Sequence, residues 1–184
     1  MNTEVTYYFD HPRNTTLINE RAVELILSLR YIDLTKGELV EVGAVTPYYI
    51  KSNHECIDPT DPKATTKDFA ENYDYRNKNV LSISTIEHIG RGDYNLEKNE
   101  ILAFNTLNKI YEESKSCLIS WPIGYNKFLD NITKNNLNKF NYFFYVKRNQ
   151  DPLWELVNDE EGFNFNYGSP FAAANSIIFI TKGI

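Results

Sequence analysis

Short β-branched runs alternate along this chain with stretches of helical periodicity, and this alternation restricts the fold more than any other feature. Residues 19–32, NERAVELILSLRYI, have apolar side chains at helical spacing after Asn19, a residue type favoured at helix N-termini. Three short apolar runs follow: ELVEVG (38–43), HECIDP (54–59) and NVLSIS (79–84). Because parallel strands joined by helices are buried on both faces, the pattern predicts an α/β protein.

The second half of the chain continues the alternation. A helix is expected between Leu96 and Ser114 and another from about Tyr125 to Thr133. The remaining expected strands are CLISWP (117–122), NYFFYVKR (141–148) and ANSIIFIT (174–181), with Trp154 in a loop. We therefore predict a Rossmann-like three-layer sandwich, with a mostly parallel twisted sheet and an antiparallel closing strand at its edge.

The chain is long enough for one packed domain. At 184 residues, about 70% of the unfolded surface can be buried. The sequence is 42% hydrophobic and 14% aromatic, which argues against disorder. We predict a single domain over residues 1–184, in which residues 1–18 form an irregular lead-in or lid.

Charge and cysteine usage restrict the partners and the compartment. The net charge of -6 provides no obvious surface for neutralising phosphates, so a small molecule is a better expected partner than nucleic acid. The two cysteines, Cys56 and Cys117, are too few for a disulfide framework. No stretch approaches the ~20 apolar residues that span a bilayer. The expected location is the cytoplasm, away from membranes.

In an open α/β sheet, ligands bind beyond the carboxyl ends of the strands, so the residues that follow each strand are the first candidates. Gly43 ends the first expected strand and lets the backbone approach a ligand closely. Asp58 ends the second and is placed to hold two ribose hydroxyls. The loop has one glycine and includes Pro47, so a pyrophosphate cradle is disfavoured. An adenosine cofactor with a cationic tail, such as S-adenosylmethionine, suits these residues and the acid at Glu41.

The same segments resemble class I S-adenosylmethionine-dependent methyltransferases, in particular a small bacterial subgroup. The likeness rests on the order of LVEVGAVTPYY (39–49), HECIDPTDP (54–62) and TTKDFAENYDYRNKNVLSISTIEHIG (65–90). It continues in FDHPRNTTLINERAVEL (9–25), SWPIGYNKFLDN (120–131) and YGSPFAAANSIIFI (167–180). The resemblance therefore covers most of the chain.

The resemblance implies a set of cofactor contacts. It places Glu41 and Gly43 at the methionine part, Asp58 at the ribose, Asp68 and Phe69 at the adenine, and Ser84, Glu87 and His88 at the reacting centre. The chain departs from the family in its single loop glycine and in the ten residues (44–53) between Gly43 and His54. So short a link leaves room for only a turn or two of the usual first helix.

Methyl transfer to a hydroxyl or amine requires positioning and removal of a proton. His88 is the expected base, because an imidazole is largely neutral at pH 7, and Glu87 is expected to orient it or contact the cofactor. The expected acceptor-binding residues are His11, Trp121, Tyr125 and Arg148, chosen from a wider set that also includes Arg13, Asn14, Arg91 and Tyr94. The family association suggests a sugar or sugar-nucleotide hydroxyl of a surface glycan as acceptor.

Other interpretations of these residues stay open. His54, Cys56 and Asp58 alternate along one strand and are metal-ligand types, but three ligands on one buried strand form an awkward tetrahedral site, so no metal is expected. A catalytically silent nucleoside-binding or scaffold domain would have the Gly43–Pro47 segment collapsed against the sheet. A nicotinamide-dependent oxidoreductase is disfavoured by the absence of a G-x-G-x-x-G run. The aromatic strand at 141–148 would suit a homodimer if it were an exposed edge.

Overall fold

The computed structural model describes residues 8–35, 37–93, 98–149, 153–158 and 160–184. In this part of the chain, seven strands form one sheet in the order β2-β1-β3-β4-β7-β5-β6. The strands are β1 (Leu39–Val42), β2 (Glu55–Ile57), β3 (Asn79–Ile83), β4 (Ser116–Pro122), β5 (Asn141–Lys147), β6 (Trp154–Val157) and β7 (Ser176–Lys182). The strands β2, β1, β3 and β4 are mutually parallel, whereas β7 pairs antiparallel with both β4 and β5, and β6 pairs antiparallel with β5.

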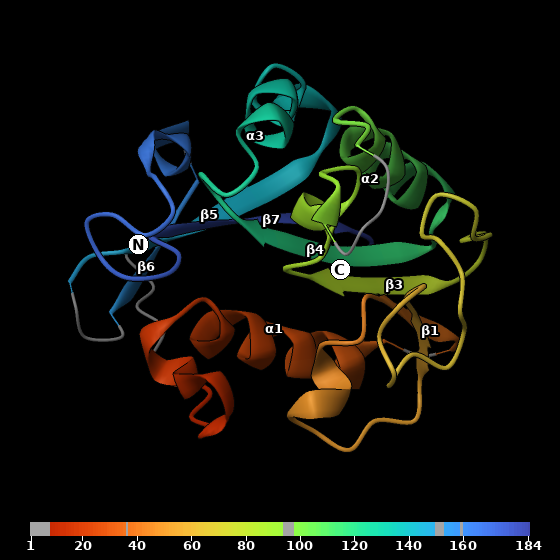
Figure 1. The fold of residues 1–184 in the computed structure, drawn as a ribbon. Coiled ribbons are helices and arrows are strands. Elements are labelled where there is room, and N and C mark those ends of the chain that lie inside the picture. Colours follow the sequence, from red (N-terminus) through yellow and green to blue (C-terminus); the bar gives the residue numbers. More distant parts are fainter. Residues whose placement is uncertain (1–7, 36, 94–97, 150–152, 159) are drawn as a thin grey trace.

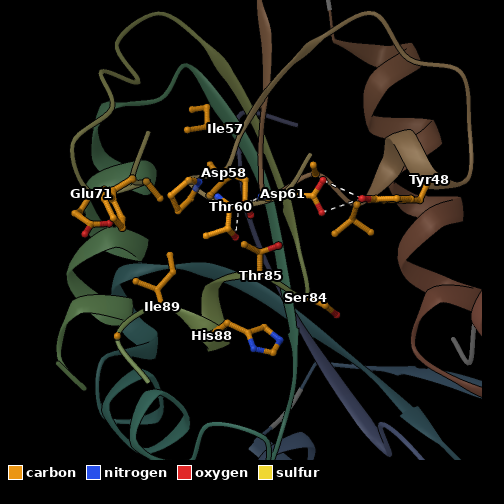
Figure 2. A pocket seen from close by; sticks show the side chains of 18 of the residues that line it. Tyr48, Ile57, Asp58, Thr60, Asp61, Glu71, Ser84, Thr85, His88 and Ile89 are labelled. Carbon is orange, nitrogen blue, oxygen red and sulfur yellow. Dashed lines mark hydrogen bonds between the residues drawn. The ribbon is translucent and has the colours of Figure 1, made fainter. Parts of the chain in front are cut away.

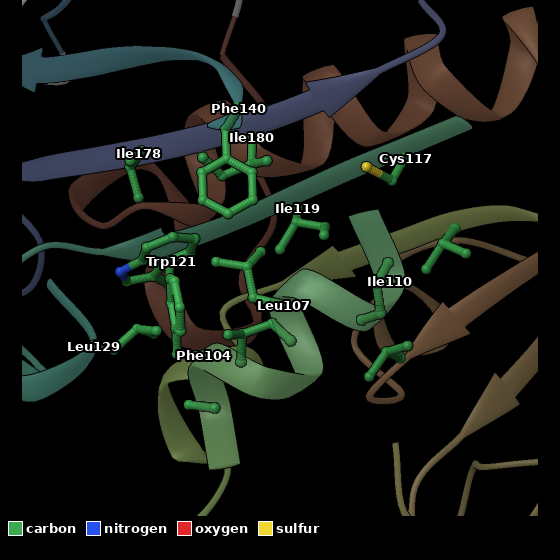
Figure 3. Close-up of a cluster of buried hydrophobic side chains, with 14 of the residues drawn as sticks. Phe104, Leu107, Ile110, Cys117, Ile119, Trp121, Leu129, Phe140, Ile178 and Ile180 are labelled. Carbon is green, nitrogen blue, oxygen red and sulfur yellow. The ribbon is translucent and has the colours of Figure 1, made fainter. Parts of the chain in front are cut away.

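Helices cover both faces of this sheet, which makes the protein a mixed α/β structure (Figure 1). Helix α1 (Arg21–Leu34) lies on one face, and helices α2 (Leu102–Glu113) and α3 (Lys127–Lys134) lie on the other. Each face has its own hydrophobic cluster. Beneath α2 and α3, the side chains of Phe104, Leu107, Ile119, Trp121 and Leu129 pack together (Figure 3).

The strand β3 explains why the sequence has near-continuous apolar runs. All five of its residues are buried. Val80 belongs to the cluster under α2 and α3, while Leu81 and Ile83 belong to the cluster under α1. A central parallel strand is buried on both faces, so apolar side chains occur in both alternating sets, here together with the buried Asn79 and Ser82.

Most of the expected elements are confirmed, with shifted ends. Helix α1 begins at Arg21, and Asn19 lies just outside it with its side-chain Oδ1 accepting the Arg21 amide hydrogen at 2.9 Å. Helix α2 begins at Leu102, later than expected. The link between β1 and β2 contains a single 3-10 turn, Thr46–Tyr48, in agreement with the short connection that the sequence predicts.

The closing part of the sheet differs from the expectation. Strand β7 is not an edge strand but lies between β4 and β5, and Trp154 begins the edge strand β6 instead of lying in a loop. Residues 176–180 of β7 are all buried, so this strand needs neighbours at both edges, whereas β6 is half-buried after Trp154 and fits the edge. Strand β5 lies between β7 and β6 and pairs with β6 over residues 144–147, so it is not the edge strand that the homodimer hypothesis required.

None of the helices in the described residues is long and apolar enough to cross a membrane.

Candidate functional site

A cleft of about 800 Å³ opens beyond the carboxyl ends of β1, β2 and β3. The chain leaves β1 to pair with β2 on one side and later places β3 on the other side, so the strand order reverses at this point. Such a reversal is where open α/β sheets bind ligands. Figure 2 shows the residues around this strand-end cleft, with Asp58 at its centre and His88 below. Gly43, Ala44 and Val45 line this open space beside Asp58, whereas Thr46 is fully buried against Glu41.

Gly43 lines the cleft and is required by the backbone. Its φ of 83° lies in the left-handed region, and its amide donates a hydrogen bond to the Ile57 carbonyl at 2.8 Å. A Cβ at this position would lie 2.2 Å from Thr85 Oγ1. Glycine therefore allows the ends of β1 and β3 to approach each other directly under the cleft.

Glu41 does not line the cleft, contrary to the expected contact with the methionine part of a cofactor. The side chain is fully buried, and its carboxylate accepts the amide hydrogens of Val45 at 3.0 Å and Thr46 at 2.8 Å. The physical reason is that the loop after β1 folds back over this carboxylate. Because two loop amides are engaged in this way, they are not available to a bound phosphate, in agreement with the predicted absence of a pyrophosphate cradle.

Asp58 both shapes its own turn and lines the cleft. Its Oδ1 accepts hydrogen bonds from the Thr60 amide at 2.8 Å, the Thr60 hydroxyl at 3.0 Å and the Asp61 amide at 2.7 Å. Within the described residues, Oδ2 has no such bond. The turn therefore fixes the carboxylate through one oxygen and leaves the other to a ligand.

Of the two residues predicted to flank the adenine, one lines the cleft. Phe69 lines the cleft with 39% of its surface exposed, and Ala70 and Glu71 continue the same wall. Asp68 does not line it, because its Oδ1 turns back to accept the Phe69 amide hydrogen at 2.8 Å. Asp68 thus orients the backbone that presents the Phe69 ring.

Ser84 connects the cleft to a buried polar group on α1. Its hydroxyl donates to both oxygens of Glu24 at 2.9 Å, and Ser120 donates to the same carboxylate at 2.7 Å. Arg21 forms an ion pair with Glu24 and lines the cleft. The neighbouring Glu24 carboxylate raises the pKa of the Arg21 guanidinium, although burial alone would lower it. A positive charge is therefore held at this wall.

His88 stands at the lower end of the cleft with 28% of its side chain exposed. Its Nδ1 lies 2.8 Å from Asp93 Oδ2, and Nε2 lies 3.9 Å from Glu87 Oε1. An Nδ1–H that donates to Asp93 leaves the Nε2 lone pair as the proton acceptor, which is the tautomer that a general base requires. The ring of Tyr125 packs against the imidazole with centroids 4.8 Å apart.

Glu87 lies behind His88 and does not line the cleft. Its side chain is 1% exposed, and Oε2 has no hydrogen-bond partner among the described residues. Burial raises the pKa of the Glu87 carboxyl well above its usual value, and the nearby Glu24 carboxylate raises it further. The Glu87 side chain is therefore not placed to contact a cofactor in the cleft directly.

The expected acceptor-binding residues divide into two groups. Tyr125 does not line the cleft but contacts His88, which does, and the guanidinium of Arg91 lies 4.5 Å from the centre of the Tyr125 ring. Trp121 is fully buried, and its Nε1 donates to Asp130 Oδ1 at 3.0 Å, so it is a core residue. Arg148 forms ion pairs with glutamates of the β5–β6 region and does not line the cleft.

The N-terminal lead-in lines the cleft, but not through His11, the residue predicted from the sequence. The His11 ring packs on Phe9 and on the edge of Tyr49, and it does not line the cleft. Arg13 and Asn14 line it instead. The proline that precedes Arg13 fixes the backbone of this turn, which brings the two side chains to the cleft. Tyr94 lies outside the described residues.

Several cleft residues were not identified from the sequence. Tyr48 donates its hydroxyl hydrogen to Asp61 at 3.0 Å, and the Arg13 guanidinium lies 4.1 Å from the centre of the Tyr48 ring. Arg21 and Asp93 were also missed. The turn sequence around Asp61 was a usable signal, whereas Arg21 lies on a helix whose contact with the strand ends has no local sequence signature.

Comparisons of the chain with protein-family models, with curated proteins and with solved structures give no match. The function is therefore inferred from the geometry of the cleft.

Proposed function

We propose that the protein is an S-adenosylmethionine-dependent methyltransferase that acts on a small polar acceptor. The observation that carries the proposal is that Gly43, Asp58 and His88, which follow three different parallel strands, border one open cleft. The order β2-β1-β3-β4, with its reversal at β1, supports a Rossmann-like assignment of the parallel strands. The cleft volume lies within the usual range for small-molecule sites, roughly 300–1,000 Å³.

The adenosine half of the cofactor has chemically suitable partners. The Asp58 carboxylate is held by its turn and suits two vicinal ribose hydroxyls, which donate to an ionised acid. The Phe69 ring and the Ala70 wall suit the face of an adenine. No anion cradle is required, because this cofactor has no phosphate.

The amino-acid tail of the cofactor would interact with the opposite wall. Glu41, which the sequence favoured for this role, is enclosed by its own loop and cannot serve. The guanidinium groups of Arg13 and Arg21 border the cleft there and suit the α-carboxylate of the tail. The sequence predicted that Glu41 contacts the positive charge of the tail. The arginines would instead contact its negatively charged α-carboxylate.

Catalysis in this proposal depends on His88. S-adenosylmethionine supplies a methyl group bonded to a sulfonium. The acceptor oxygen or nitrogen attacks the methyl carbon in line with the carbon–sulfur bond, and the sulfur is the leaving group. His88 Nε2 takes the proton that the acceptor loses, and Asp93 stabilises the resulting imidazolium through Nδ1. The methyl group moves to the acceptor, the electron pair returns to sulfur, and the proton resides on His88.

A sugar hydroxyl is the acceptor class that the surroundings of His88 favour. Tyr125 packs on the imidazole, and Tyr167, 39% exposed, lies with its ring centroid 5.3 Å from that of Tyr125. A half-buried ring and an exposed ring beside a positive Arg91 suit the apolar faces and hydroxyls of a sugar or of a sugar nucleotide.

Calorimetric titration with S-adenosylhomocysteine tests the cofactor site. We expect micromolar binding by the unmodified protein and a roughly 10- to 100-fold weaker Kd for Asp58→Asn, because one charged hydrogen-bond acceptor is lost. Asp58→Asn is preferred to alanine because the amide oxygen can still accept the turn hydrogen bonds. Arg148→Gln is the matched control and should bind with unchanged affinity. Absence of heat from a folded sample, with an unchanged Tm, would overturn the proposal.

A second experiment separates binding from catalysis. We expect His88→Gln to bind S-adenosylhomocysteine normally but to methylate an acceptor, chosen from a panel of sugars and sugar nucleotides, about 10²- to 10⁴-fold more slowly. If the unmodified protein binds the cofactor and methylates no member of the panel, the sugar assignment fails. Equal rates for His88→Gln and the unmodified protein would remove His88 from the mechanism.

A further inference from the structure

A second group of polar side chains lies beneath the loop that follows β1. Glu41 Oε2 is 2.8 Å from His54 Nε2 and 3.6 Å from Cys56 Sγ. We call Glu41, His54 and Cys56 the Glu41 cluster. One ligand atom from each of these residues lies within 4.8 Å of the other two. These three side chains are separate from the residues that line the strand-end cleft.

The strand pairing brings the Glu41 cluster together. Glu41 on β1 is the direct register partner of Cys56 on β2. His54 lies two residues before Cys56, so its side chain leaves the strand on the same face. From the sequence, His54, Cys56 and Asp58 were judged an awkward set of metal ligands, because all three lie on one strand. The parallel pairing replaces Asp58, which turns to the cleft, with Glu41 from the neighbouring strand.

We propose that the Glu41 cluster binds a divalent transition-metal ion, and that this ion is naturally zinc. A carboxylate, an imidazole and a thiolate are all zinc ligands, with bonds of roughly 2.0–2.3 Å. Tetrahedral angles between such bonds give roughly 3.3 Å between oxygen and nitrogen and roughly 3.6 Å between oxygen and sulfur. The observed Glu41–Cys56 separation fits, and the Glu41–His54 separation is about half an ångström shorter than the tetrahedral value.

A further oxygen donor adjoins the cluster. The hydroxyl of Thr46 contacts Glu41 Oε2 and lies 3.3 Å from His54 Nε2. Thr46 is fully buried and is fixed by the bond from its amide to Glu41. The hydroxyl is thus placed at the remaining side of the site, where zinc commonly takes a weaker fourth ligand.

The charges of the cluster favour an ion. Without metal, the Glu41 carboxylate is fully buried beside the Cys56 thiol, with Oε2 3.6 Å from the sulfur. On binding, a sulfur–metal bond replaces the Cys56 S–H bond and that proton leaves to solvent, while the proton that His54 Nε2 donates to Glu41 Oε2 moves to Nδ1 and frees Nε2 for the metal. The thiolate and the carboxylate then carry two negative charges against the two positive charges of the ion, so the buried group becomes neutral.

The cluster has a route to solvent. A groove of about 740 Å³, which is distinct from the strand-end cleft, is lined by His54 together with Leu29 and Ile50. The His54 side chain is 7% exposed, so it is the member of the cluster nearest to bulk water. An ion that enters here would clamp β1 to β2 and fix the Gly43–Thr46 loop through Glu41.

Cobalt(II) titration of the metal-free, chelator-treated protein tests the site. We expect one equivalent of cobalt to produce visible bands of a tetrahedral site and a near-ultraviolet thiolate-to-metal band. Zinc should displace the cobalt, raise the Tm and release about one proton per ion, measured by calorimetry in buffers of different ionisation enthalpy. Absence of the thiolate band from a folded sample, with a Tm that zinc does not change, would overturn the proposal.

Matched variants locate the ion. Cys56→Ser keeps a hydrogen-bond donor to Glu41 but removes the thiolate, so the near-ultraviolet band should disappear. Cys117→Ala, which removes the other buried thiol, should keep the band. His54→Gln provides an independent test if the serine variant does not fold, and should weaken cobalt binding at least tenfold. A band that persists in folded Cys56→Ser would place the metal elsewhere and refute the assignment.

Discussion

The parallel half of the sheet (β2, β1, β3 and β4) and the antiparallel half (β7, β5 and β6) both contribute to the hydrophobic core, but their strands end differently. In the parallel half, β1, β2 and β3 end at one edge, and Gly43, Asp58 and Ser84 meet around the same cleft. In the antiparallel half, neighbouring strands end at opposite edges, so no such convergence occurs. Shared strand direction is therefore what assembles the site.

Aromatic side chains show the same contrast. In the antiparallel half, Phe143 stacks on Phe179 with ring centroids 5.1 Å apart, and Phe144 meets Phe163 edge-on at 5.0 Å. These rings fill the core. Beside the parallel half, Tyr125 contacts the partly exposed imidazole of His88. An aromatic residue thus acts as packing in one half and as part of a candidate binding surface in the other.

The largest expected effect comes from adding one methyl group at Gly43. Gly43→Ala combines a φ of 83° with a contact of 2.2 Å to Thr85, so we expect it to lower the free energy of unfolding by about 4 kcal/mol. It should also abolish binding of S-adenosylhomocysteine, because the ends of β1 and β3 must separate. Denaturant unfolding and calorimetry measure the two effects.

Gly162→Ala is the matched change in the antiparallel half. Its added Cβ would lie 2.2 Å from the Phe144 ring, so the steric overlap is equally close. We expect a clear loss of stability with unchanged cofactor affinity in the folded fraction. If both variants lose binding to the same extent, the two halves are coupled and the contrast between them is wrong.

The two halves meet where β4 pairs with β7, and Asp130 forms a hydrogen bond with Trp121 of β4. Trp121 on β4 donates to Asp130, and burial raises the pKa of this carboxyl to about 6 from an ordinary value of 3.8. Because the folded state holds the proton more tightly than the unfolded state, stability should fall as the pH rises from about 4 to about 6 and then level off. The expected contribution to this fall is about 3 kcal/mol.

Asp130→Asn isolates that contribution. The variant loses the ionisable group, so its unfolding free energy should lack the Asp130 step, although its absolute stability changes through the bond from the Gly124 amide. Denaturant unfolding at a series of pH values measures the difference between the two proteins. Curves that run parallel from pH 4 to pH 6 would show that Asp130 titrates normally.

The sequence predicted the parallel half better than the antiparallel half for a physical reason. The strands β1, β2 and β3 are β-branched runs stopped by Gly43, Asp58 and a polar segment, and a strand end is a local signal. Which edges β7 occupies depends on pairings between residues far apart in the chain. The local pattern therefore gave the right strand and the wrong place for it.

The site residues divide in the same way. Asp58 and His88 were predicted from their positions after strands, and both line the cleft. Glu41 and Trp121 were assigned to binding, but both are buried. The sequence could not show this, because both faces of a central strand are apolar and the pattern does not tell which side chain reaches a ligand. Arg21 was missed because it reaches the cleft only through the packing of α1.

The smallest expected effect belongs to Arg148, which the sequence placed in the acceptor site. It bridges Glu155 and Glu161 on the antiparallel half, with one Nη1–Oε1 distance of 3.0 Å. Since these groups are partly exposed, we expect Arg148→Gln to cost less than about 1 kcal/mol of stability, and less still in 1 M salt. Thermal unfolding at low and high salt measures this cost. A large loss of methyl transfer by Arg148→Gln with normal stability would instead extend the site across β7, and the separation of the two halves would no longer hold.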